Sequence, residues 1–331
     1  MSLLPWHHTI WQDLVRRQHG SGLPHALLFS GLEGIGKHLL ALHTAKWLLC
    51  LRDDGEPCNQ CHSCQLWDAG SHPDFMLCQP EDGSRQIRID AIRRVNDFLA
   101  QTPQISHCQV VSLRPVEVMN TNAANALLKT LEEPAGESFL LLETERFGSV
   151  LPTIRSRCQR LTLNPPGQGE ALAWLTGQGF AATEAEQALR LNHGAPLQAR
   201  DWLSGDQGSQ QQRWLELLQQ WTQGTAPLQV VADGWGKYEL TDMASWFYSL
   251  LADCLKLNMG IADSQLVYGA RIGGLLAGAT PATAKLITLQ DRVKNVLARL
   301  LSGAGNYNKQ LLIESLLLEW RDMMAERPAA G

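Results

Sequence analysis

The sequence has no stretch of 18 apolar residues, and its first ten residues contain no apolar segment behind a basic start. A membrane helix needs about 20 apolar residues and a secretion signal needs such a segment, so neither feature is indicated. Basic residues are not in excess either, since Lys and Arg number 28 against 33 Asp and Glu, a net charge of −5. The sequence therefore predicts a cytoplasmic protein with no membrane partner and no generally basic surface for nucleic acid.

What the chain does have is length and the composition of an ordinary globular protein. Its 331 residues are 44% hydrophobic and 18% charged, which is enough for two or three domains with separate cores. It also contains eight cysteines. In a cytoplasmic protein these are expected to be metal ligands or buried thiols rather than disulfides.

A phosphate-binding loop occupies residues 31–38, GLEGIGKH, but its last position is altered. In the motif G-x-x-x-x-G-K-[ST], backbone N–H groups and the lysine hold phosphate oxygens, and the final hydroxyl binds Mg²⁺. His38 replaces that hydroxyl, and an imidazole nitrogen is a poor ligand for magnesium. Two interpretations of Lys37 remain open, namely weak phosphate binding and a solvated lysine at a helix start. The glycines that would share in phosphate binding are Gly31, Gly34 and Gly36.

The acidic strand end that accompanies a working phosphate loop is also missing. It is expected directly after the apolar run 110–113, where a carboxylate would hold Mg²⁺ and polarise water. Arg114 and Pro115 follow that run instead, and neither can coordinate the metal. Glu117 is the nearest carboxylate, but it lies beyond the expected strand tip, and catalytic geometry tolerates little displacement. ATP hydrolysis by this chain would therefore lack two elements that handle magnesium.

Short apolar runs alternate with helical patterns between about residues 24 and 163, which is typical of an α/β domain with a largely parallel sheet. Two prolines and a glycine at 165–167 resist both helix and strand, so they indicate a domain boundary. We expect domains at 1–164, at 165–207 (small and helical) and at 208–331 (all helical). The predicted strands are 26–29, 75–77, 110–113, 139–142 and 160–163, and the predicted helices include 37–51, 90–101, 122–133, 214–221, 243–257, 282–301 and 310–323.

Four cysteines, Cys50, Cys58, Cys61 and Cys64, lie close together in an insertion at about residues 50–64. Their spacing predicts a zinc site with four thiolate ligands. Such a site is structural rather than catalytic, because four protein ligands leave no open position on the metal.

Other interpretations of these cysteines remain open. Cys50 could be a core residue at a helix end, which would leave the other three cysteines as a redox motif. His62 or His72 could also replace one of the thiols. The isolated cysteines in apolar surroundings, which we expect to be buried, are Cys78, Cys108 and Cys254.

Residues 125–134, NALLKTLEEP, and the tripeptide Ser156-Arg157-Cys158 closely resemble the bacterial clamp-loader branch of the AAA+ ATPases. The resemblance covers nearly the whole chain, including 308–318, which is similar to the collar helix of the family. It implies a RecA-like AAA+ domain with a phosphate loop (P-loop) and a parallel sheet. A small helical lid domain and an all-α collar domain for oligomerisation would follow.

In this family the arginine of the Ser-Arg-Cys motif acts in trans, as a finger that stabilises charge in the ATP site of a neighbouring subunit. Arg157 is the matching position, Arg155 is its nearest rival, and Cys158 is expected to pack beneath the finger. The alternative is an ordinary arginine that pairs with a carboxylate. Members that hydrolyse ATP also carry a lid arginine at the position of Leu197, so a third element is missing here.

The resemblance therefore implies a non-hydrolysing subunit that acts as a stator and is no enzyme on its own. Its implied partners are gamma/tau-type ATPase subunits and a delta-type subunit in a hetero-pentameric ring. That ring loads a sliding clamp on primed DNA for the DNA polymerase III holoenzyme. DNA-directed DNA polymerase activity would belong to the holoenzyme, because the chain offers no convincing carboxylate pair for nucleotidyl transfer. Structural zinc is the implied cofactor, and ATP binding by this chain stays open.

Two other functions remain open. An autonomous AAA+ ATPase, such as a helicase loader or a remodelling protein, would have to tolerate His38, Arg114 and Leu197. A disulfide-exchange protein would use the clustered cysteines, which tightly bound zinc would exclude.

Overall fold

The computed structural model describes residues 3–52, 54–81, 84, 86–134, 136–205, 207–263, 266–276, 281–301 and 305–325. The chain divides into two compact units. The first comprises Met1–Ala182 with Asn192–Arg200, and the second comprises Thr183–Leu191 with Asp201–Gly331. None of the described helices combines the length and the apolar character that crossing a membrane requires.

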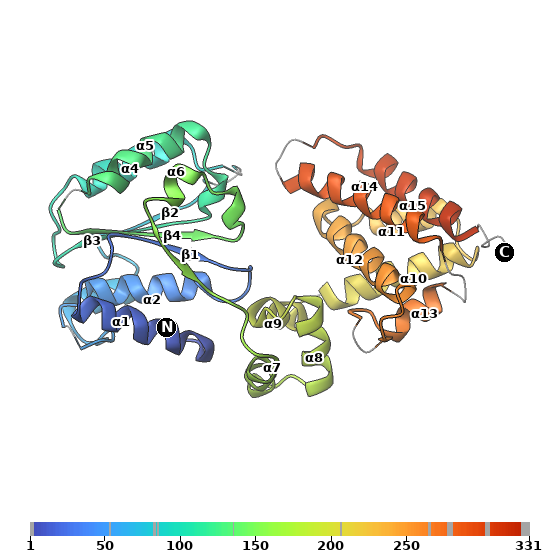
Figure 1. The fold of residues 1–331 in the computed structure, drawn as a ribbon, viewed down its shortest axis with the longest axis horizontal. Helices are drawn as coiled ribbons and strands as arrows, with labels where there is room; N and C mark the ends of the chain where they lie inside the picture. Colours follow the sequence, from blue (N-terminus) through green and yellow to red (C-terminus); the bar gives the residue numbers. More distant parts are fainter. Residues whose placement is uncertain are drawn as a thin grey trace. The chain divides into compact units, whose positions relative to one another are not determined.

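A five-stranded parallel sheet forms the centre of the first unit (Figure 1). In spatial order the strands are β2 (Phe75–Cys78), β3 (Gln109–Leu113), β4 (Ser138–Thr144), β1 (Ala26–Ser30) and β5 (Gln159–Thr162). Every residue of β1 and β3 is buried, as expected for central strands covered on both faces. The predicted α/β domain with a parallel sheet is confirmed. Because all strands run the same way, the segments that follow β1, β3 and β4 meet at one edge of the sheet.

Helices cover both faces of this sheet, and each layer has its own core (Figure 1). On one face lie α1 (His8–His19) and α2 (Lys37–Leu49), and on the other lie α4 (Ile89–Leu99), α5 (Thr121–Glu132) and α6 (Pro152–Arg155). The shorter or peripheral elements of this unit are η1 (Pro5–His7), α3 (His62–Asp68), η2 (Val116–Val118), η3 (Phe147–Ser149) and α7 (Gln168–Gly177).

The chain returns to the first unit through residues 192–200, which contain the start of α9 (Pro196–Ser204). Ala195 is buried in the core that α1 and α2 share with the sheet. The backbone N–H of Leu197 donates to the carbonyl oxygen of Gly34 at 2.9 Å. This returning segment therefore forms one wall of the phosphate loop.

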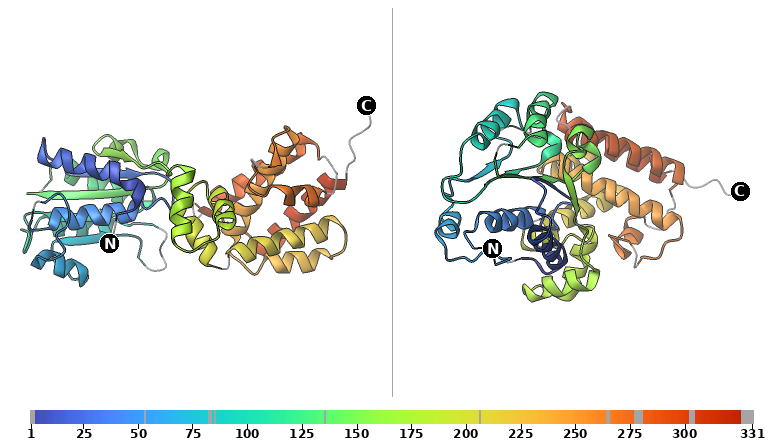
Figure 2. Two further views of the ribbon diagram at one scale, coloured as in Figure 1. Left: turned by 90° about the horizontal axis from the view of Figure 1, so that it is seen from below. Right: turned by 60° about the vertical axis from the view of Figure 1, so that its left-hand side comes forward.

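The second unit contains helices and no strands among its described residues (Figures 1 and 2). Its core gathers large aromatic side chains, including the fully buried Trp214, Trp235 and Trp320. Some of the indole N–H groups in this core find acceptors; Trp221 Nε1 donates to the Leu317 carbonyl at 2.9 Å. The predicted all-helical C-terminal part is confirmed. Its helices are α8 (Ala182–Leu191), α10 (Gln207–Thr222), α11 (Leu228–Trp235), α12 (Leu240–Asn258), α13 (Ala270–Leu276), α14 (Thr283–Leu301) and α15 (Lys309–Ala325).

Candidate functional site

The phosphate loop links β1 to α2, and two of its glycines are required by its shape. Gly34 and Gly36 have φ angles of +75° and +88°, in the left-handed region that favours glycine. A Cβ atom on Gly36 would lie 2.5 Å from Leu4 Cδ1, and one on Gly34 would lie 2.6 Å from Gln198 Cγ. The loop is therefore packed tightly between the N-terminal segment and the start of α9.

A pocket of about 230 Å³ opens beside this loop. His38, Arg114, Pro115 and Leu197 all line it, so the three elements at which the sequence departs from the usual motifs converge on one space. The sequence analysis identified Arg114 and Pro115 from their place after a predicted strand, and Leu197 from the family resemblance. The remaining lining comes from the loop, the first turn of α2 and the end of β4, including Glu33, Glu143 and Glu145.

Lys37 is buried in this loop, and its Nζ donates to the carbonyl oxygen of Leu32 at 2.7 Å. Burial lowers the pKa of Lys37, while the negative charges of Glu145 and Glu143 act in the opposite direction. The ammonium group is therefore bound to the loop itself. A phosphate would have to compete with the Leu32 carbonyl for it.

His38 pairs with Glu143 at the position where a hydroxyl would hold magnesium. Its Nδ1 lies 2.8 Å from Glu143 Oε1, and Ser112 Oγ donates to the same oxygen at 3.3 Å. The Glu143 side chain is only 6% exposed, so this carboxylate is largely removed from water. Sequence reasoning missed Glu143, although an acidic residue at the carboxyl end of a buried strand was a usable signal.

Glu117, the nearest carboxylate in the sequence, does not reach the pocket. One of its oxygens accepts hydrogen bonds from the backbone N–H groups of Glu145 at 3.0 Å and Arg146 at 3.2 Å. Its side chain is 2% exposed. Glu117 therefore anchors the turn after β4 and is not a pocket-lining group.

The N-terminal segment holds the phosphate loop from the other side. Trp6 Nε1 donates to the carbonyl oxygen of Ile35 at 2.9 Å, and His7 Nε2 lies 2.9 Å from the same oxygen. Burial lowers the pKa of His7 to about 4, so its ring is neutral near pH 7 and its Nε2 carries the donated proton. The sequence analysis did not identify Trp6 or His7, because nothing local connects them to a loop 28 residues away.

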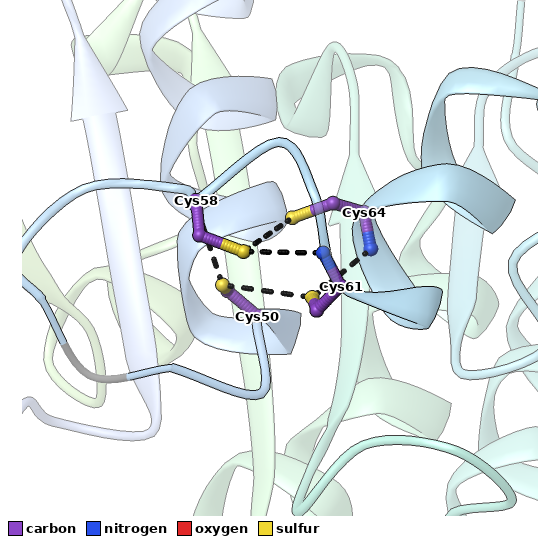
Figure 3. A group of neighbouring side chains, drawn as sticks. All are labelled: Cys50, Cys58, Cys61 and Cys64. Atoms are coloured by element: carbon purple, nitrogen blue, oxygen red, sulfur yellow. Dashed lines mark hydrogen bonds between the residues drawn. The ribbon is translucent and has the colours of Figure 1, made fainter.

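The four clustered cysteines meet as predicted (Figure 3). Their sulfur atoms all lie within 4.8 Å of one another, with 3.9 Å between Cys50 and Cys61 and 3.9 Å between Cys58 and Cys64. Four sulfurs at about 2.3 Å from a tetrahedral Zn²⁺ would be separated by about 3.8 Å. The cluster therefore has the dimensions of a four-thiolate metal site.

Backbone N–H groups support this cluster. The N–H of Cys58 donates to Cys50 Sγ at 3.4 Å, that of Cys61 to Cys58 Sγ at 3.3 Å, and that of Cys64 to Cys61 Sγ at 3.5 Å. Hydrogen bonds from the backbone of Gln60 and Cys61 lower the pKa of Cys58 to about 6, whereas burial raises the pKa of Cys64. Such donors stabilise thiolates, which are the form that binds a metal.

The alternative ligands for this cluster are not brought into it. His72 Nε2 lies 2.9 Å from Ser63 Oγ, and its Nδ1 accepts the backbone N–H of Asp74 at 3.1 Å, so both ring nitrogens are engaged. In the described part of the chain the metal-competent group consists of cysteines alone, which leaves out His62. Cys50 lies with the other three thiols rather than apart as a core residue. The isolated Cys78, Cys108 and Cys254 are buried as predicted.

Arg157 lies just after α6 and is held by α5. Its Nε donates to Glu132 Oε1 at 2.8 Å, its Nη2 bonds the same oxygen, and its Nη1 donates to the Thr153 carbonyl at 2.9 Å. Its side chain is nevertheless 33% exposed. The rival Arg155 packs over the ring of Phe147, with 5.1 Å between its Cζ atom and the ring centre.

Cys158 is half-buried against the core beneath α5 and α6. Burial raises the pKa of its thiol to about 12, so this cysteine is a packing residue and not a reactive thiolate.

Two protein-family models match this chain. The model described as "DNA polymerase III, delta subunit" matches residues 6–167, and the model described as "DNA polymerase III, delta subunit, C terminal" matches residues 206–322. Among solved structures, a gamma subunit-related protein of DNA polymerase III from Thermotoga maritima aligns with a TM-score of 0.46 and 19% identity. That alignment covers 95% of this chain and 99% of the other.

Relatives of known identity match over nearly the full length. The chain is 35% identical to the DNA polymerase III subunit delta' of Pseudomonas aeruginosa, over 97% of this chain and 98% of the relative. It is 31% identical to subunit delta' of Escherichia coli K12, over 96% of this chain and 95% of the relative. On this match the chain belongs to the family of the delta-prime subunits of DNA polymerase III.

Proposed function

We propose that this chain is a non-hydrolysing subunit of a clamp loader. The observation that carries the proposal is the His38–Glu143 pair, which puts an imidazole and a carboxylate where an active phosphate loop holds Mg²⁺. Glu143 is already bonded by His38 and Ser112, and Lys37 is bonded by the Leu32 carbonyl. The groups that would bind a magnesium–nucleotide complex are thus engaged with one another.

The charge of the pocket supports the same conclusion. Three glutamates line it, whereas its permanent cations are Lys37 and Arg114. Burial raises the pKa of Glu145, and the nearby charge of Glu33 adds to that effect, which is typical of carboxylates that repel one another. A triphosphate without its magnesium would meet this repulsion directly.

Arg157 is the residue through which this chain would contribute to ATP hydrolysis by a neighbouring subunit. A guanidinium is permanently charged and matches phosphate oxygens with two parallel N–H donors. Its partial exposure would let it enter the ATP site of a neighbouring subunit and stabilise charge on the transferring phosphoryl group. In this arrangement the chain acts as a stator. It contributes to hydrolysis by its neighbour and hydrolyses nothing itself.

The partners follow from the family. We propose a hetero-pentameric ring with gamma/tau-type ATPase subunits and a delta-type subunit, which loads a sliding clamp on primed DNA. Polymerase activity would then belong to the assembled holoenzyme. A metal held by Cys50, Cys58, Cys61 and Cys64, for which zinc is the best fit, would stabilise the insertion at 50–64 by replacing a hydrophobic core with four metal–sulfur bonds.

The decisive experiment measures ATP hydrolysis by a reconstituted loader in the presence of clamp and primed DNA. One loader contains the unaltered chain, one contains Arg157→Ala, and one contains Arg155→Ala as the matched control from the same helix end. Size-exclusion chromatography confirms that each variant assembles. We expect Arg157→Ala to lower hydrolysis at the one site that it serves by about 10³-fold or more, as for other arginine fingers, so that the share of that site in the turnover of the ring is lost, and Arg155→Ala to have little effect.

Unchanged turnover with Arg157→Ala would refute the action in trans. A large loss with Arg155→Ala alone would assign the finger to that residue instead. Turnover by the isolated chain, at a rate like that of the loader, would favour an autonomous ATPase.

A further inference from the structure

Glu132 occupies an unfavourable position that the proposed function does not explain. It is the last residue of α5, where the partial negative charge of the helix end disfavours a carboxylate. It also belongs to the segment 125–134 on which the family resemblance depends. A cation offsets this charge, and that cation is Arg157, which follows the neighbouring helix α6 (Figure 1).

Glu132 and Thr153 hold the guanidinium of Arg157 along two of its edges, and this set of contacts is called the grip below. Nε and Nη2 of Arg157 both bond Oε1 of Glu132, while Nη1 donates to the carbonyl oxygen of Thr153. The grip thus comes from two elements, the end of α5 and the turn of α6. It fixes the plane of the guanidinium as well as its position, because two of its edges are held.

This grip leaves part of the guanidinium available. Of its five N–H groups, two are directed to Glu132 and one to Thr153. One N–H of Nη2 has no further hydrogen bond among the described residues, and the second N–H of Nη1 has only a 3.4 Å contact with Ser156 Oγ. Nη1 and Nη2 are the two terminal nitrogens of the guanidinium, through which phosphate oxygens can accept a pair of hydrogen bonds.

We propose that Glu132 is a positioning residue, which holds the guanidinium of Arg157 in the orientation that a neighbour's phosphoryl group requires. The proposal rests on the proposed function, since it assumes that Arg157 acts in trans. A long arginine side chain otherwise samples many rotamers, and catalysis loses much of its rate when a reacting group is misplaced by about 1 Å. Glu132 thereby gives the segment 125–134 a role in catalysis by the assembled ring.

The opposite role would give an effect of opposite sign. If Glu132 merely sequestered Arg157 until assembly, removing its charge would release the finger and raise turnover. A positioning role requires that turnover falls. The sign of the change therefore separates the two roles directly.

The test uses reconstituted loaders with Glu132→Gln, with Arg157→Ala, and with both substitutions together. Glu133→Gln is the matched control. Glu133 is the next residue and is exposed, and its side chain makes no hydrogen bond or ion pair with the described residues. We expect Glu132→Gln to lower kcat for clamp- and DNA-stimulated hydrolysis at the site that Arg157 serves about tenfold, with the KM for ATP and ring assembly unchanged. The double variant should be no slower than Arg157→Ala, because both substitutions remove the same interaction.

Each outcome decides the matter. A loss with Arg157→Ala but none with Glu132→Gln, or losses that multiply in the double variant, would overturn the positioning role and leave the finger in place. Faster turnover with Glu132→Gln would replace positioning by sequestration. No loss with Arg157→Ala would refute the proposed function and this inference together. The melting temperature of each isolated chain shows whether Glu132→Gln acts through folding instead. A large drop for Glu132→Gln, accompanied by loss of ring assembly, would overturn the positioning role.

Discussion

The imidazole of His38 and the carboxylate of Glu143 are 105 residues apart in sequence and 2.8 Å apart in the phosphate-loop pocket. The pair joins the first turn of α2 to the end of β4, which lies beside β1 in the sheet. It also receives a hydrogen bond from Ser112 on β3. In place of the hydroxyl that the motif usually has at position 38, the pocket therefore contains a connected set of hydrogen bonds among His38, Glu143 and Ser112.

Restoring the hydroxyl alone should not restore ATP hydrolysis. His38→Thr returns the usual magnesium ligand, but Arg114, Pro115 and Leu197 still line the pocket in place of the other required groups. We expect no magnesium-dependent hydrolysis above background by the isolated variant in a phosphate-release assay. Turnover at about 1 s⁻¹, the lower end for ordinary enzymes, would contradict this expectation.

The loop glycines should be intolerant of a methyl group. Gly34→Ala would combine a left-handed backbone with a Cβ atom 2.6 Å from Gln198 Cγ, so we expect a loss of about 1–3 kcal/mol in the free energy of unfolding. Gly169→Ala is the control, because Gly169 lies in α7 with nothing within 4 Å of an added Cβ atom. Alanine should stabilise that helix by about 0.5–1 kcal/mol. Urea denaturation followed by circular dichroism measures both changes.

Acid should destabilise the chain through His7. Folding lowers the pKa of His7 from 6.5 to about 4, so the unfolded chain binds the extra proton between those pH values. Its contribution is therefore complete above pH 6.5 and is lost as the pH falls toward 4. At pH 5 the loss amounts to about 2 kcal/mol relative to pH 7.5.

The variant His7→Gln isolates this effect. A glutamine amide can still donate to the Ile35 carbonyl but does not titrate, so its stability should fall less between pH 7.5 and pH 5. Other buried histidines, such as His43 and His72, also have lowered pKa values and contribute equally to both chains. Equal losses for the two proteins, in urea titrations at the two pH values, would show that His7 is not responsible.

Purified protein should contain about one zinc ion per chain, held by the four clustered cysteines. Cys61→Ser or Cys64→Ser should abolish stoichiometric binding, whereas Cys108→Ser, at a buried cysteine outside the cluster, should retain it. Metal analysis by mass spectrometry tests each variant. Chelation should lower the melting temperature of the unaltered chain, because binding free energy contributes to folding. Freshly prepared protein without metal would refute the site.

Local patterns predicted the first unit well because its elements are specified by short segments. The central strands β1 and β3 are buried throughout and mostly apolar, and the four cysteines are close in sequence, so the short segment after α2 brings them together. The observed ends of strands differ from the predicted ends where polar contacts determine how far a strand extends. We expected a strand to end at Leu142, but β4 continues through Glu143 and Thr144, which are buried by contacts from distant segments.

The remaining features could not be found from local sequence. The bonds from Trp6 and His7 to Ile35, and the grip of Glu132 on Arg157, join segments whose proximity depends on the finished fold. In the second unit the sequence analysis also missed α11 and α13. The second of these contains Gly273 and Gly274, which oppose helix formation in isolation, so tertiary packing outweighs local propensity there.

The phosphate loop is held at three points by the chain itself: the Gly34 carbonyl by Leu197, the Ile35 carbonyl by Trp6 and His7, and the Lys37 amine by Leu32. In nucleotide-driven proteins the γ-phosphate orders switch loops near the phosphate loop, and its loss releases them. Because hydrogen bonds from the chain itself already order this loop, neither binding nor hydrolysis of ATP would change its conformation. We therefore expect the phosphate loop of this subunit to keep one conformation while neighbouring subunits bind and hydrolyse ATP.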